Sequence, residues 1–149
     1  MNLRDAFLKV LAGNEDDTKV RLSYADWLDE QGEHEEADRQ RKWPAAKEWL
    51  VKICRENSNG YEQTSYPELI DFGREVVKDG VVAERVSMRN ESLWYALKSH
   101  TQQFWNNWSI VTGIALPPAL QDKGFHHWAC CSHEVYYWFG KPDEDENDS

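Results

Sequence analysis

One stretch decides the fold of this chain: Arg21-Leu22-Ser23-Tyr24-Ala25-Asp26-Trp27-Leu28-Asp29-Glu30-Gln31-Gly32. Its larger side chains recur at spacings of three and four residues, the period of one face of an α-helix. That face holds Val20, Tyr24, Trp27, Leu28 and Gln31. Gly32 can adopt the left-handed conformation that ends a helix. We therefore predict one complete amphipathic helix here, with a structural and not a catalytic role.

The preceding residues predict a partner for this helix. Apolar side chains repeat with helical spacing over residues 3–12, between Asn2 as N-cap and Gly13 as the end. Asn14 is predicted to cap the second helix, with Asp17 three residues later as in a capping box. Because the connection is short, we expect the two helices to form an antiparallel hairpin.

Several segments of this hairpin follow a known order. They are Asp5-Ala6-Phe7-Leu8, the acidic turn Asn14-Glu15-Asp16-Asp17, the stretch from Arg21 to Gly32, and Glu36-Ala37-Asp38-Arg39. In this order the chain resembles the bacterial repeat-companion domain, whose pattern centres on Arg-Leu-x-Tyr-Ala-Asp-Trp-Leu-x-Glu-x-Gly. It departs from that pattern at Glu33-His34, which replaces Asp-Pro, and at Arg39-Gln40-Arg41, which replaces a more apolar ending. The resemblance covers residues 1–42 and implies a helical module of repeat-carrying proteins, with no established activity.

The middle of the chain continues the helical pattern. A polar helix is predicted from Glu33, interrupted at Pro44 because proline lacks an amide donor. Beyond the proline, a core-facing stripe follows: Ala46, Trp49, Leu50, Ile53 and Cys54. A polar loop over residues 57–64 is the predicted boundary between two halves. Ser65 then opens another helix as a capping box with Glu68.

The last third holds the densest aromatic content. Residues 81–88 are predicted to form a helical turn, with a short strand as the alternative. Asn90 is predicted to cap the longest helix, whose core-facing stripe is Trp94, Leu97, Thr101, Phe104, Trp105, Trp108 and Val111. Residues 125–139 are rich in aromatic side chains and are expected as a strand or a hairpin.

These patterns predict a mainly α protein, a helical hairpin plus a small helical bundle, with a short β element left open near the C-terminus. Residues 1–57 are expected as the repeat-companion-like module with its kinked helix, and residues 65–140 as a helical domain packed on it. Residues 141–149 are expected as a disordered acidic tail. The 149 residues and 8 Trp, 6 Tyr and 5 Phe suffice for a real core.

Charge and cysteine content limit the function classes. The formal net charge is −10, of which five charges come from acids within residues 143–149. We expect no direct binding to nucleic acid, because an acidic chain lacks the positive surface that contacts phosphates. The same sign suits an acidic mimic of nucleic acid. Three cysteines cannot all pair, which favours a reduced, cytoplasmic protein, and we expect no signal peptide and no membrane span.

One cluster offers metal or thiol chemistry. It consists of His126, His127, Cys130, Cys131 and His133, all of them side chains of the kind that bind zinc. A second Cys/His pair is missing from the sequence pattern, so buried cysteines and hydrogen-bonded histidines are the favoured interpretation, and no cofactor is predicted. A cysteine nucleophile with a neighbouring histidine base is disfavoured, because sequence neighbours rarely have the required geometry.

Two further groups have a functional and a structural interpretation. Asp26, Asp29 and Glu30 could act as general acid and base, but a hydrated helix face is favoured. Trp105 and Trp108 are predicted to be core, whereas Tyr136, Tyr137 and Trp138 are predicted to form a partner-binding patch.

We therefore predict a non-enzymatic cytoplasmic protein that binds a protein partner. The alternatives are an acidic nucleic-acid mimic that inhibits a DNA- or RNA-binding protein, and a metal-binding protein that uses the cluster from His126 to His133.

Overall fold

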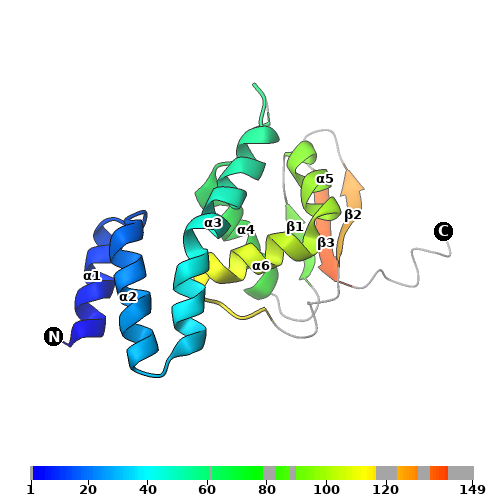
Figure 1. The fold of residues 1–149 in the computed structure, drawn as a ribbon. Coiled ribbons are helices and arrows are strands. Elements are labelled where there is room, and N and C mark those ends of the chain that lie inside the picture. The colour runs from blue at the N-terminus through cyan, green and yellow to red at the C-terminus, as the bar shows by residue number, and fades with distance from the viewer. Residues whose placement is uncertain are drawn as a thin grey trace. The chain divides into compact units, whose positions relative to one another are not determined.

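The computed structural model describes residues 2–60, 62–78, 83–87, 90–116, 124–130 and 135–140, and these are mainly α-helical (Figure 1). The elements in order are α1 Leu3–Gly13, α2 Thr18–Glu30, α3 His34–Glu56, α4 Tyr66–Lys78, β1 Ala83–Ser87, α5 Glu91–Ser99, α6 Thr101–Thr112, β2 Gly124–Cys130 and β3 Val135–Gly140. The predicted acidic tail lies outside the described residues. None of the helices in the described ranges combines the length and apolar character needed to cross a membrane.

The chain divides into two compact units, residues 1–48 and 49–149, which we call the N-terminal and C-terminal units. The division falls inside α3, which contributes residues to both units. The boundary predicted from the sequence is instead the polar loop at residues 57–64. Each unit has its own hydrophobic core.

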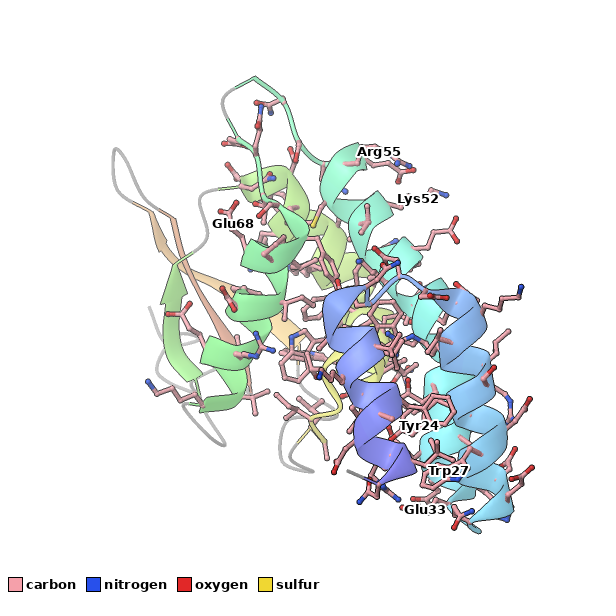
Figure 2. All side chains as sticks on the ribbon, turned by 90° about the vertical axis from the view of Figure 1, so that its left-hand side faces the viewer. Tyr24, Trp27, Glu33, Lys52, Arg55 and Glu68 are labelled. Carbon is pink, nitrogen blue, oxygen red and sulfur yellow. The ribbon has the colours of Figure 1, made fainter. Side chains whose placement is uncertain are left out.

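The core of the N-terminal unit lies between α1, α2 and the start of α3. Its buried members are Leu11, Tyr24, Ala25, Leu28 and Ala37. Tyr24 stacks on Trp27, with 6.2 Å between the ring centroids, and both side chains lie between α1 and α2 (Figure 2). The helical hairpin predicted from the sequence is therefore present, with Tyr24 and Trp27 packing it.

The ends of α2 show one correct and one wrong prediction. Gly32 has a φ of +80° and ends the helix as expected, and the amide of Glu33 donates to the carbonyl of Leu28 at 2.9 Å. The predicted N-cap was wrong, because α2 begins one turn later than expected. Asp17 is the cap, accepting from the amide of Val20 at 3.1 Å, while Asn14 instead ends α1.

The predicted interruption at Pro44 was also wrong, since α3 runs without a break from His34 to Glu56. A proline inside a helix costs about 3 kcal/mol, because it removes one amide donor and its ring crowds the carbonyl four residues earlier. The buried residues on either side, Trp43 and Ala46, hold the helix in its packed position. Burial of their apolar surface offsets this loss.

The C-terminal unit has the larger core. Its most deeply buried side chains include Trp94, Phe104 and Trp108, and Trp105 is also buried, so the prediction that these aromatics form the core is confirmed. The capping box at α4 is confirmed too. The amide of Ser65 donates to Oε1 of Glu68 at 3.1 Å, and the amide of Glu68 donates to Oγ of Ser65 at 3.3 Å.

The single long helix predicted after Asn90 is two helices. Asn90 caps α5 as expected, but the chain leaves the helical conformation at His100 and resumes as α6. The Oγ1 of Thr101 donates to the carbonyl of Leu97 at 3.0 Å, the carbonyl that a continuous helix would bond through the Thr101 amide. Side-chain competition of this kind is a recognised cause of helix ends.

Within the described ranges, three strands form an antiparallel sheet of order β1-β3-β2. The β element near the C-terminus is thus present as β2 and β3. The helical turn favoured for residues 81–88 was wrong, because β1 occupies 83–87. A run this short has no readable periodicity, and its partner β3 lies far away in the sequence.

Candidate functional site

The candidate site is a half-open hollow of about 320 Å³ on the C-terminal unit, which we call the Trp49 pocket. Two regions of the sequence line it. They contribute Trp49, Lys52, Ile53, Glu56, Asn57, Ala96 and His100. The lining combines two aromatic rings, two opposite charges and one amide.

One wall comes from consecutive turns of α3. Positions 49, 52, 53 and 56 lie on one face of a helix, since residues three, four and seven apart are neighbours there. Ile53 is buried in the core, Trp49 is half-buried, and Lys52 and Glu56 are exposed. In Figure 2, Lys52 projects outward from α3. The stripe predicted from the sequence therefore supplies the apolar part of this wall.

The opposite wall exists because α5 and α6 are separate helices. The break at His100 places its imidazole beside Trp49, with 6.5 Å between ring centroids and 85° between ring planes. Two rings at nearly a right angle form a corner. Ala96 lies one turn before the break, and its small side chain leaves this corner open.

Hydrogen bonds hold the end of the pocket that Asn57 lines. Nδ2 of Asn57 donates to the carbonyl of Ile53 at 2.7 Å, and the carbonyl of Asn57 accepts from Nδ2 of Asn90 at 2.7 Å. Asn90 is buried and also accepts from the amide of Leu93 at 3.1 Å. The end of α3 is thereby tied to the start of α5, which preorganises the pocket.

The charges at the rim form a weak pair. Nζ of Lys52 lies 3.8 Å from Oε1 of Glu56, and both side chains are more than half exposed. Exposed pairs of this kind contribute about 0–1 kcal/mol. Either group can therefore leave its partner to meet a ligand.

Cys54 lies on α3 beside the pocket residues but is buried and has no catalytic character. Burial raises the pKa of its thiol to about 12, with a smaller contribution from the negative charge of Glu68. A thiol in this state is not a nucleophile at neutral pH, because the thiolate is the reactive form.

The N-terminal unit contains a buried polar network that sequence reasoning missed. The guanidinium of Arg21 lies 3.7 Å from the centroid of the Trp43 ring and donates to Oε1 of Gln40 at 2.5 Å and to the carbonyl of Glu15 at 2.7 Å. Arg21 is only 5% exposed. A signal was available, since Arg21 precedes Tyr24 and Leu28 by three and seven residues and so lies on the buried face of α2.

The predicted metal cluster is only partly described. His126, His127 and Cys130 lie in β2, where the backbone pairs His126 with Trp138 and His127 with Tyr137. Cys131 and His133 lie outside the described residues. Among the parts of the chain whose side chains are described, no group of three or more histidine, cysteine or acidic side chains could hold a metal ion.

The predicted partner-binding residues Tyr136, Tyr137 and Trp138 are consecutive in β3, the central strand. Tyr136 and Tyr137 pair with β1, and all three pair with β2 through the backbone. The structure describes only the backbone of these three residues, so the partner-binding patch stays a prediction.

The acids of α2 form ion pairs with α3. Asp29 pairs with Arg41 at 2.6 Å and is hydrogen-bonded to Nδ1 of His34 at 2.8 Å, and Asp26 pairs with Arg41 at 2.9 Å. Hydrogen bonds from His34 and then Arg41 hold the pKa of Asp29 below its ordinary value. Glu30 is exposed. This arrangement agrees with the hydrated face expected from the sequence.

Comparison of the chain with protein-family models, with curated proteins and with solved structures finds no match in any of the three.

Proposed function

We propose that this chain is a non-enzymatic protein-interaction module of the cytoplasm and that the Trp49 pocket is its contact surface. The half-buried indole of Trp49 in an open hollow is the observation that carries this proposal. Tryptophan in a depression with a polar rim is the type of residue that contributes most to protein binding. The rim here supplies an ammonium, a carboxylate and an amide.

The distribution of charge favours recognition of a protein over mimicry of nucleic acid. Acidic side chains of the described helices pair with cations along α2 and α3, as in Glu36 with Arg39 and Asp38 with Lys42. A phosphate mimic needs a continuous negative face, whereas these pairs give a mixed surface.

The N-terminal unit fits the role of a scaffold in this proposal. Its three helical segments carry the resemblance to the repeat-companion domain, and we propose that residues 1–42 are such a domain. Tyr24 and Trp27 are used in packing α1 against α2, which supports a structural role for the motif.

The test compares two reversals of charge on one helix. Glu56→Lys alters the pocket rim, and Glu48→Lys makes the same change at an exposed position of α3 outside the pocket. Tagged full-length protein and each variant are used to capture partners from the cells of origin, followed by mass spectrometry. We expect a protein captured by the unaltered chain and by Glu48→Lys, and lost with Glu56→Lys.

A third variant addresses the predicted patch on β3. Replacing Tyr136, Tyr137 and Trp138 together by serine is expected to leave that capture unchanged if the pocket alone is the contact surface. Loss of the partner with this variant and retention with Glu56→Lys would move the contact surface to the sheet.

A further inference from the structure

We infer that the Trp49 pocket binds an arginine side chain presented by a basic segment of the partner, an inference that rests on the proposed function.

The N-terminal unit shows how this chain holds a guanidinium. Arg21 stacks on the indole of Trp43 and donates to two oxygen atoms, one from the side chain of Gln40 on the same helix as the indole. The components are therefore an indole face, a side-chain oxygen near it on the same helix, and a second oxygen from another segment. Together they hold a planar cation by stacking on its face and by accepting from its Nη1 and Nη2 groups.

The Trp49 pocket has two of these components, the indole face and a side-chain oxygen on the same helix, and a second side-chain oxygen where that helix ends. Trp49 supplies the indole, and Glu56 supplies carboxylate oxygens from the same face of α3, seven residues later. Asn57 uses its Nδ2 on the carbonyl of Ile53, which leaves Oδ1 as an acceptor. Among the described residues, no donor bonds to this oxygen. Because Glu56 and Asn57 both line the pocket, a guanidinium there has two acceptors of different kinds.

The existing cation at the rim does not fill this role. Lys52 reaches Glu56 only at 3.8 Å and is more than half exposed. A guanidinium forms two parallel hydrogen bonds to a carboxylate and stacks on an aromatic face, which an ammonium does not do. An arginine from a partner therefore displaces Lys52 at little cost.

The charge of the whole chain favours the same occupant. With 27 acidic and 17 basic residues, the chain has a formal net charge of −10 and attracts a basic segment. Complementary charge of this kind raises association rates and disfavours acidic competitors.

The test uses nuclear magnetic resonance on the full-length ¹⁵N-labelled protein. The probes are capped pentapeptides with glycine at four positions and arginine, lysine or citrulline at the centre. Citrulline keeps the shape of arginine but has no charge. The indole N–H signal of Trp49 is assigned with the Trp49→Phe variant. We expect a saturable shift of this signal with the arginine peptide, binding about fivefold weaker with lysine, and no saturable shift with citrulline.

Matched variants test the acceptors. Glu56→Gln removes the charge with little change of shape and is expected to weaken binding of the arginine peptide about tenfold. Glu48→Gln, on the same helix but outside the pocket, is expected to bind like the unaltered protein. Lys52→Ala removes the competing cation and is expected to tighten binding about twofold to threefold. The spectra of the remaining amides report that each variant is folded.

Equal binding of the citrulline and arginine peptides would overturn the inference, as would unchanged binding by Glu56→Gln. An arginine peptide that shifts signals elsewhere and leaves Trp49 unmoved would also overturn it. If partner capture is lost with Glu56→Lys but the arginine peptide does not bind, the proposed function stands and the arginine inference fails. If the peptide binds at Trp49 but capture does not depend on Glu56, the proposed function fails instead.

Discussion

At the scale of single residues, Gly73 shows how closely α4 and α6 pack. A Cβ atom added to Gly73 would lie 2.2 Å from Nε1 of Trp108 and 2.6 Å from its Cε2. The indole cannot easily retreat, because Trp108 is fully buried and its Nε1 donates to the carbonyl of Ile70 at 3.1 Å. Glycine is therefore required at this position by space and not by backbone conformation.

We predict that Gly73→Ala lowers the free energy of unfolding by about 2–3 kcal/mol through overpacking. Urea denaturation followed by far-UV circular dichroism measures the change. Gly60→Ala is the control, because a Cβ there meets nothing within 4 Å, and its effect is expected to stay within about 0.5 kcal/mol. Equal stability of the two variants would contradict the close packing of α4 and α6.

Cys54 gives a second prediction at this scale. Because burial raises the pKa of its thiol to about 12, Cys54 is expected to resist alkylation by iodoacetamide in the folded protein at pH 8. In denaturant its pKa returns to the ordinary range, and the residue is expected to react fully. Peptide mapping by mass spectrometry reads Cys54 separately from the other two cysteines. Rapid labelling of Cys54 in the folded protein would show that the core around α3 opens readily.

At the scale of elements, two asparagine caps allow a direct comparison. Asn2 and Asn90 each accept a hydrogen bond from the amide three residues later, at 2.8 Å and 3.1 Å. Asn2 is exposed, whereas Asn90 is 1% exposed and also donates to the carbonyl of Asn57. Asn90 therefore caps α5 and holds the end of α3 as well.

We predict that Asn90→Ala costs about 2 kcal/mol of unfolding free energy, since it removes a cap and leaves the part-buried carbonyl of Asn57 without its donor. Asn2→Ala removes the cap alone and is expected to cost about 0.5–1 kcal/mol. Chemical denaturation of both variants provides the comparison. A smaller effect at Asn90 than at Asn2 would mean that the link between α3 and α5 contributes nothing.

Local signals predicted several of the helix ends. The capping box at Ser65 and the left-handed glycine at position 32 act within a few residues, so the sequence is sufficient to locate them. Two of the errors arose where distant contacts decide. Pro44 is kept in α3 by packing, and β1 forms because β3 pairs with it. The candidate site was missed for the same reason.

That pocket combines two predicted features with one that was not predictable. Trp49 and Ile53 were recognised as one helical stripe, but nothing in the local sequence shows that Ala96 and His100 lie opposite them. Their position depends on the break between α5 and α6, which no glycine or proline marks. A threonine hydroxyl in competition with the backbone is a weak signal within an otherwise continuous helical pattern.

At the scale of the whole molecule, two separate cores predict two regions of independent stability. Leu28 and Leu97 are each fully buried, one in the core of the N-terminal unit and one in that of the C-terminal unit. Truncation of either to alanine is expected to cost about 2–5 kcal/mol in its own unit.

Hydrogen exchange with mass spectrometry resolves where the loss occurs. Leu28→Ala is expected to reduce protection in α1 and α2 and to leave α4, α5 and α6 as they were. Leu97→Ala is expected to give the reverse pattern. Loss of protection throughout both units in either variant would show that they unfold as one.

The proposal that the Trp49 pocket contacts a protein partner is tested most directly by photo-cross-linking in the cells of origin. A photoreactive amino acid replaces Lys52 in the pocket or, as the matched control, Lys42. Both are exposed lysines of α3, and each forms an ion pair with an acidic residue four positions away in the same helix. We expect a discrete heavier product from position 52 and none from position 42. Cross-linking from position 42 but not from position 52, or no product from position 52, would contradict the pocket as the contact surface.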